Sequence, residues 1–99
     1  MKQYRLEAIS AVELDIEAAF EWYEREDAGL GLEFLTQLRA AYERILDHPS
    51  GYQELRSGIR RAFTRQFPYA IYFSIESDTI IVLAVLHAAR DSAEWQQRT

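Results

Sequence analysis

Hydrophobic and polar residues follow two kinds of pattern along the first half of the chain. Residues 3–9 alternate between apolar and charged side chains, which predicts a short strand. Two stretches of helical period follow, separated by a break that holds two glycines. The first helix is expected to begin at Ser10, because Ser10 and Glu13 fit a capping box in which both side chains satisfy free backbone amides. The second helix is expected over 32–48, because Pro49 prevents its continuation.

The second half of the chain has the pattern of a sheet. A loop or edge strand leads to Gly58, and strands are expected over 59–67, 69–75 and 79–86, the last two joined by a tight turn. The polar tail is expected to form a short helix or a docked coil. The element order β-αα-βββ predicts an α+β fold, in which an antiparallel helical hairpin packs on one face of a small, mostly antiparallel twisted sheet.

The last two strands are apolar on both faces, because neither alternates between apolar and polar side chains. Two helices can cover only one face of the hairpin that these strands form. The sequence therefore predicts that something outside the chain covers the other face.

Composition narrows the class of protein. Ninety-nine residues, 48% of them hydrophobic, are expected to fold as one domain over residues 1–99. The absence of cysteine excludes disulfides and thiol chemistry. No apolar run approaches the roughly 20 residues of a membrane helix, and the N-terminus lacks the apolar segment of a signal peptide, so a soluble cytoplasmic protein is expected. His48 and His87 lie too far apart in the sequence to form a ligand set, and neither a metal nor a cofactor is expected.

Charge is distributed unevenly along the chain. The net charge is −5, which disfavours non-specific binding of nucleic acid because long-range repulsion opposes approach. Within residues 56–65, however, four arginines occur with no acidic residue among them. This arginine run could contact a phosphate or dock a target, or it could be a solvated strand face paired with the acidic first helix.

His87 ends the last strand, and Arg90 follows three residues later. A histidine could perform acid–base chemistry there, with an arginine stabilising developing negative charge. A structural hydrogen bond at the end of a strand explains His87 equally simply, because no second base stands at a recognisable spacing.

Short motifs spread over nearly the whole chain resemble the RelE/ParE superfamily of toxins from bacterial type II toxin–antitoxin systems, and most closely its ParE, or plasmid-stabilisation, branch. The motifs are Asp15-Ile16, Trp22-Tyr23, Gly29-Leu30-Gly31 with Phe34, His48-Pro49, Arg60-Arg61, 67–72 (FPYAIY), Val85-Leu86-His87 with Arg90, and Trp95. Each motif is short and common, and it is their order and spacing that carry the resemblance.

The resemblance implies a toxin that inhibits an essential target, DNA gyrase, and that is neutralised by a cognate ParD-like antitoxin in a hetero-oligomer. It implies neither sequence-specific nucleic-acid binding nor membrane association. The residues expected to dock the target are Arg60, Arg61, Arg65 and Arg90. Those expected to bind the antitoxin are Phe63, Phe67, Tyr72, Ile81, Leu83 and Val85.

Two alternatives stay open. The chain could resemble the ribosome-dependent messenger-RNA endoribonucleases of the superfamily, with His87, Arg90 and Arg61 as catalytic residues. Its single lysine, Lys2, and the absence of a tyrosine after Tyr72 depart from that pattern. The chain could also be a non-toxic member that serves as an interaction scaffold, which its acidic balance favours.

Overall fold

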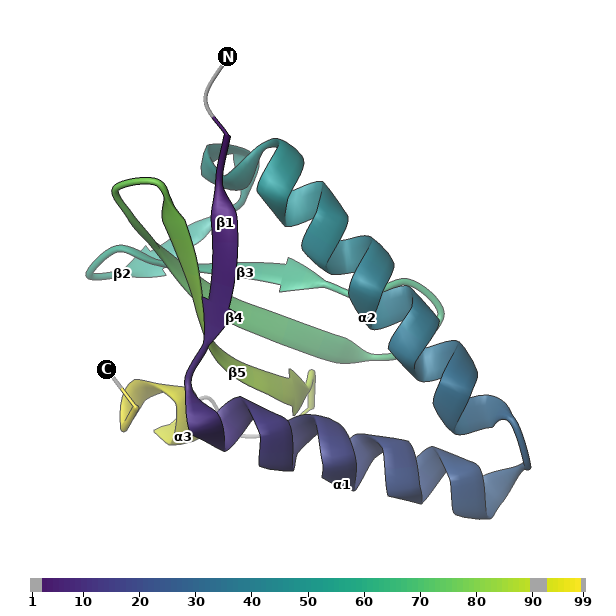
Figure 1. Ribbon diagram of the computed structural model, residues 1–99. Helices are drawn as coiled ribbons and strands as arrows, with labels where there is room; N and C mark the ends of the chain where they lie inside the picture. The colour runs from purple at the N-terminus through teal and green to yellow at the C-terminus, as the bar shows by residue number, and fades with distance from the viewer. Residues whose placement is uncertain (1–2, 90–92, 99) are drawn as a thin grey trace.

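The computed structural model describes residues 3–89 and 93–98, and its elements follow the predicted order (Figure 1). The helices are α1 (Ser10–Glu26), α2 (Leu30–Asp47) and the short α3 (Ala93–Gln96), with a 3-10 turn, η1 (Pro49–Gly51). The strands are β1 (Arg5–Ala8), β2 (Glu54–Arg56), β3 (Ile59–Phe63), β4 (Tyr69–Glu76) and β5 (Thr79–His87). None of the described helices has the length and hydropathy needed to cross a membrane.

The five strands form one sheet in the order β1-β5-β4-β3-β2. β1 pairs with β5 in parallel, and all other neighbours are antiparallel. The predicted α+β class, with a mostly antiparallel sheet, is therefore confirmed. The register of β4 against β5 shifts between Tyr72 and Phe73, which places a bulge at Leu83 in β5.

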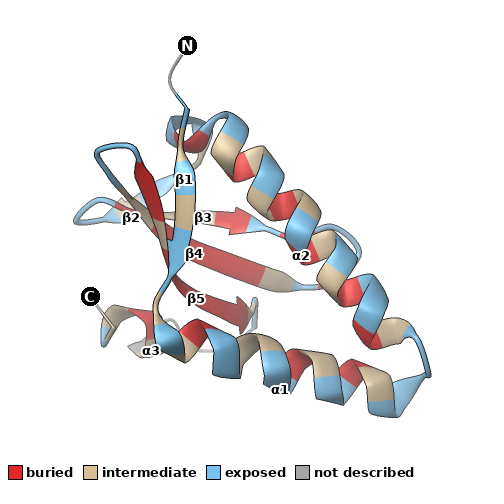
Figure 2. Cartoon of the chain, viewed as in Figure 1, coloured by how far each residue is buried: buried red, intermediate tan, exposed pale blue. Residues whose placement is uncertain are grey.

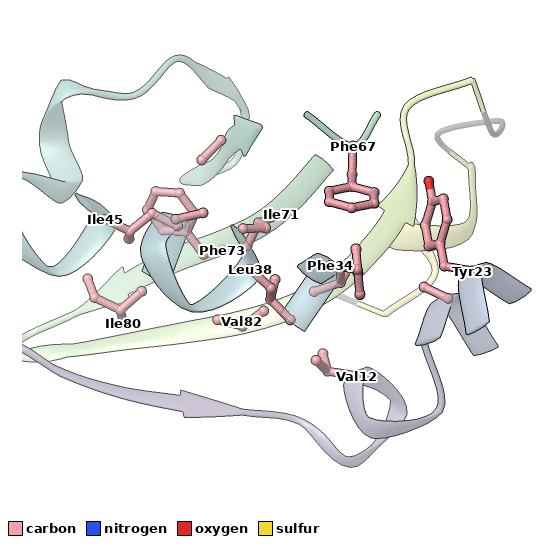
Figure 3. Close-up of a cluster of buried hydrophobic side chains, with 14 residues drawn as sticks. Val12, Tyr23, Phe34, Leu38, Ile45, Phe67, Ile71, Phe73, Ile80 and Val82 are labelled. Carbon is pink, nitrogen blue, oxygen red and sulfur yellow. The ribbon is translucent and has the colours of Figure 1, made fainter. Parts of the chain in front are cut away.

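The main hydrophobic core lies between the two long helices and one face of the sheet (Figure 3). Val12 from α1 and Ile45 from α2 point onto Phe73 and Val82 of the sheet. At one end of this core Phe67 packs edge-on against the ring of Tyr23, with 4.8 Å between ring centroids. The two long helices therefore cover one face of the sheet, as the sequence predicted.

The opposite face of the hairpin is partly covered by the chain itself. Trp95 of α3 stacks on Tyr72 with 5.0 Å between ring centroids, and a second cluster forms around it from Ile59, Leu83 and Leu86. The expectation that this cover must come from outside the chain is wrong at this point, because the polar tail carries one large apolar side chain that reaches the sheet.

The predicted capping box is absent. Ser10 is the first helical residue, and α1 has no side-chain cap. The reason is that the chain leaves β1 directly into the helix. The amide of Ile9 donates to Val82 O, and the carbonyl of Ile9 accepts from the amide of Val12, so Ile9 takes the capping position.

The strand predicted over 59–67 ends four residues early, at Phe63. Thr64 closes a turn instead, with its amide donating to Tyr69 O and its hydroxyl to Phe67 O at 2.6 Å. Gln66 adopts a left-handed conformation with φ of 71°. The turn rotates Phe67 into the main core and leaves Arg65 exposed.

Candidate partner-binding groove

A groove of about 890 Å³ lies between α1 and the end of β5. Three parts of the chain line it. They are one side of α1 (Ala11, Leu14, Asp15, Ala18, Ala19, Trp22, Tyr23 and Arg25), the end of the β4–β5 hairpin (Pro68, Tyr69, Val85, Leu86 and His87), and the tail (Glu94 and Arg98). It is thus bounded by segments far apart in the sequence.

The helix wall of the groove is an apolar stripe that the protein itself leaves uncovered. Leu14 and Trp22 expose 69% and 52% of their surface, and Ala18 between them is also exposed. Ala11 continues the apolar stripe at one end, and the charged Arg25 follows it at the other. Spacings of three and four residues place all five on one side of the helix, beside the buried side that holds Ala19. Figure 2 shows buried and exposed residues recurring along α1.

The groove exists because β1 accompanies β5 only as far as Val82. Beyond that residue the chain turns into α1, and the outer edge of β5 has no neighbouring strand among the described residues. Two side chains instead form hydrogen bonds with backbone groups at this edge of β5. The amide of Val85 donates to Asp15 Oδ2 at 3.0 Å, and Arg98 Nη1 donates to Leu83 O at 3.0 Å.

The same two side chains form a two-bond ion pair. Arg98 Nη1 lies 2.6 Å from Asp15 Oδ2, and Arg98 Nη2 lies 3.0 Å from Asp15 Oδ1. The side chains are 17% and 6% exposed, so water screens the pair little. The hydrogen bonds to Asp15 raise the pKa of Arg98 further. The pair joins the tail, α1 and β5 at the floor of the groove.

Two tyrosines near the groove are held in their neutral form. Burial, with a smaller contribution from the negative charge of Asp15, raises the pKa of Tyr42 to about 12. The Tyr42 hydroxyl is buried and has no hydrogen-bond partner in the described part of the chain. Burial, with a smaller electrostatic contribution from Tyr69, also raises the pKa of Tyr23.

His87 lies in the wall of the groove, edge-on to the ring of Tyr69. Its Nδ1 accepts a hydrogen bond from the amide of Ala89 at 3.1 Å, so the neutral ring carries its proton on Nε2. This is the structural hydrogen bond that the sequence left open as one of two roles. Arg90, its expected neighbour in a catalytic site, lies outside the described residues. Across residues 3–89 and 93–98, no three histidine, aspartate or glutamate side chains are placed to hold a metal ion.

Three of the four arginines expected to dock a target lie within the described residues, and their environments differ. Arg60 is held by the chain, because its Nη1 donates to Tyr52 O at 2.6 Å and to Ser50 O at 3.3 Å. Arg61 lies on the opposite face of β3, with its guanidinium 5.1 Å from the ring centre of Phe63. Arg65 is exposed in the turn before β4. Arg61 and Phe63 do share a face, but Phe67 and Arg65 do not extend it, because the strand ends.

The six residues expected to bind the antitoxin do not form one surface. Phe67 and Val85 belong to the core beneath the helices, whereas Tyr72 and Leu83 lie under Trp95 on the opposite face. Ile81 is partly buried beside them, and Phe63 alone of the six is widely exposed. These positions are apolar in the sequence, but the sequence alone could not assign them to the two faces of the sheet.

The stripe on α1 and the pair of Asp15 with Arg98 were not predicted as a site. A signal for the stripe was present, since apolar residues at 11, 14, 18 and 22 recur at helical spacing beside the core positions. Asp15 was noted only as part of the Asp15-Ile16 motif of the family resemblance, and nothing in the sequence distinguished its role from that of the other carboxylates of α1.

These features define a small α+β protein with a helical hairpin on one sheet face and an open apolar groove beside its first helix. Solved structures share the fold. One chain, from "Chromosomal ParDE TA system from P. aeruginosa", superposes with a TM-score of 0.76 at 12% identity, over 86% of this chain and 96% of that one. A comparison with curated protein sequences gives no significant match.

The sequence itself identifies the family. The profile of the ParE toxin of the type II toxin–antitoxin system parDE matches residues 10–92, which is most of the chain. The protein belongs to the ParE toxin family.

Proposed function

We propose that this protein is the toxin of a two-component toxin–antitoxin module, that it acts in the cytoplasm as a single domain, and that a cognate antitoxin neutralises it. The family match over residues 10–92 carries this proposal. The open apolar groove supports the partner, because exposed apolar surface of this kind is typical of protein-binding sites.

We further propose that the target is DNA gyrase and that the protein inhibits it by binding, without catalysing a reaction. The placement of His87 supports a non-catalytic role, because the lone pair of Nδ1 already accepts the amide of Ala89. Among the predicted docking arginines, Arg61 and Arg65 are the stronger candidates. The guanidinium of Arg60 is occupied by backbone carbonyls of its own chain.

Controlled induction of the protein in bacteria tests the first proposal. Colony counts are expected to fall on induction and to recover when the antitoxin gene, sought beside the toxin gene, is co-induced. If growth is unchanged although folded protein is present, the proposal that the protein is a toxin is refuted. The interpretation as a non-toxic interaction scaffold would then remain.

Supercoiling by purified gyrase tests the target. Inhibition is expected in the presence of the protein, and an unaffected rate at saturating protein would refute the gyrase proposal. Translation-dependent cuts in messenger RNA, lost in His87→Ala, would instead establish the endoribonuclease. Arg65→Glu is expected to weaken gyrase inhibition, whereas Arg39→Glu, the same charge change at another exposed site, is the matched control.

A further inference from the structure

The outer edge of β1 presents backbone groups that the described part of the chain leaves without partners. The amides of Arg5 and Ile9 donate to carbonyls of the β4–β5 hairpin, at 2.9 Å and 3.1 Å. Amides along a strand point alternately to its two sides, so those of Leu6 and Ala8 point away from β5. Neither of these two amides has a hydrogen-bond partner among the described residues. In Figure 1, β1 crosses in front of the other strands and no element covers it.

The two edges of the sheet are protected to different degrees. β2, at the far edge, has three residues, and its register against β3 shifts between Glu54 and Arg56. Irregular pairing of this kind prevents an edge strand from adding a further strand. β1 pairs with β5 in a regular register over all four of its residues. The edge of β1 is therefore the one at which another strand can be added.

The exposed charges of β1 are complementary to a second copy of the same strand. Arg5 and Glu7 lie on the sheet face opposite the long helices, because Leu6 between them packs against the main core. Their side chains are widely exposed and form only a long ion pair of 3.7 Å with each other. In an antiparallel pair of β1 strands centred on Leu6, Arg5 of each copy stands opposite Glu7 of the other. Opposite charges at such positions stabilise a strand pair.

The same charges exclude the neighbouring registers. With the centre moved to Arg5, two arginines stand opposite each other, and with the centre at Glu7, two glutamates do. The centre at Leu6 also suits the backbone, because Leu6 directs its amide and carbonyl outward and can exchange two hydrogen bonds with its own copy. The small, exposed Ala8 then lies opposite the larger side chain of Tyr4.

We infer that β1 binds β1 of a second copy of this chain, antiparallel and centred on Leu6, so that the protein forms a symmetric dimer through this edge. The pairing joins the two sheets into one and places the helices of both copies on the same face of it. The contact is small, so the expected Kd of the dimer is about 10–100 μM. The inference goes beyond the proposed function and does not depend on it, because it concerns the isolated protein.

Exchange of the two charges tests the register. Arg5→Glu and Glu7→Arg each place like charges opposite each other twice in a homodimer, and each is expected to weaken the dimer by at least about 10-fold in sedimentation equilibrium. An equimolar mixture of the two variants is expected to recover the dimer, because every glutamate of one chain then faces an arginine of the other. A mixture that associates no better than the separate variants would overturn the inference.

The far edge of the sheet supplies the matched control. β2 carries the same two residue types two positions apart, so Arg56→Glu and Glu54→Arg make the same changes of net charge there. They are expected to leave the Kd of the dimer within about 2-fold of the wild-type value. A larger effect at β2 than at β1 would show that the other edge associates. Wild-type protein that stays monomeric at about 1 mM would leave the edge of β1 to a strand of another protein, and would likewise overturn the inference.

Hydrogen exchange locates the contact directly. The amide of Leu6 is expected to gain protection as the protein concentration rises through the Kd, whereas the amide of Ile9, already bonded within the chain, changes little. Arg5→Glu is expected to abolish the gain at the same concentration. A dimer that forms without added protection of Leu6 would place the interface elsewhere and refute the pairing of β1 with its copy.

Discussion

Breaking the ion pair between Asp15 and Arg98 is expected to destabilise the protein far more than breaking an ordinary surface pair. Arg98→Met keeps most of the aliphatic stem and removes the charge. Among the partners that the described residues give it, the carboxylate of Asp15, 6% exposed, then retains only the amide of Val85. Removing one partner of a buried pair costs about 3–5 kcal/mol. Because Arg98 is 17% exposed, the expected loss of unfolding free energy is about 2–3 kcal/mol.

A double-mutant cycle isolates the pair from other effects of each change. Combining Arg98→Met with Asp15→Asn should cost less than the sum of the single changes, with a coupling of about 1–2 kcal/mol. Urea denaturation followed by tryptophan fluorescence and by circular dichroism measures the four free energies of unfolding.

The chain offers its own control in Arg5 and Glu7, a pair whose side chains are 71% and 61% exposed. Its coupling is expected to be about 0–1 kcal/mol and to fall further at high salt. The hydrogen bond that Arg5 also donates to Thr79 is lost in both arms of that cycle and cancels. A coupling of Asp15 with Arg98 no larger than that of the control pair would refute the reasoning.

Four further changes test the packing. Tyr42→Phe removes a buried hydroxyl without a partner and is expected to stabilise the protein by about 1 kcal/mol in urea denaturation. Because the folded pKa of Tyr42 is about 12 and the unfolded value is near 10, wild-type stability should fall by about 2 kcal/mol between pH 10 and 12 relative to Tyr42→Phe. Gly31→Ala is expected to cost about 1–3 kcal/mol in thermal unfolding, since its Cβ would lie 2.8 Å from Phe20 carbons, whereas Gly58→Ala meets no atom within 4 Å but is strained by its φ of +80°. Trp95→Ala should cost about 3–5 kcal/mol, and an unchanged melting temperature would show that the tail is not part of the cooperative unit.

The fold could be predicted from the sequence because local signals and packing agree in most of the chain. Helical period, glycines and Pro49 define the hairpin of α1 and α2, and continuous apolar runs define β4 and β5. The errors occur where contacts distant in sequence override the local pattern. Ser10 does not cap α1, because the ladder between β1 and β5 continues through Ile9 into the helix.

The candidate site was harder to predict. When both faces of a strand are apolar, its sequence does not show which face packs against the helices and which against the tail. Val85 and Leu83 both read as candidates for a partner surface, yet one packs under the helices and the other under Trp95. From the sequence alone Arg60 could be a free cation. Only the path of the chain through η1 to the start of β2 shows that the carbonyls of Ser50 and Tyr52 accept its hydrogen bonds.

The role of α1 follows from the same limitation, because its sequence serves three environments at once. Tyr23 and Val12 pack in the core, Asp15 closes the edge of β5, and Leu14 and Trp22 line the groove. A helix that faced only a core and solvent would carry one apolar stripe, whereas this helix carries a second stripe beside the first. Leaving two large apolar side chains in water gives the isolated protein no stabilisation from their burial. A partner that covers them would recover that free energy, and this is the physical basis for proposing the stripe as a partner-binding surface.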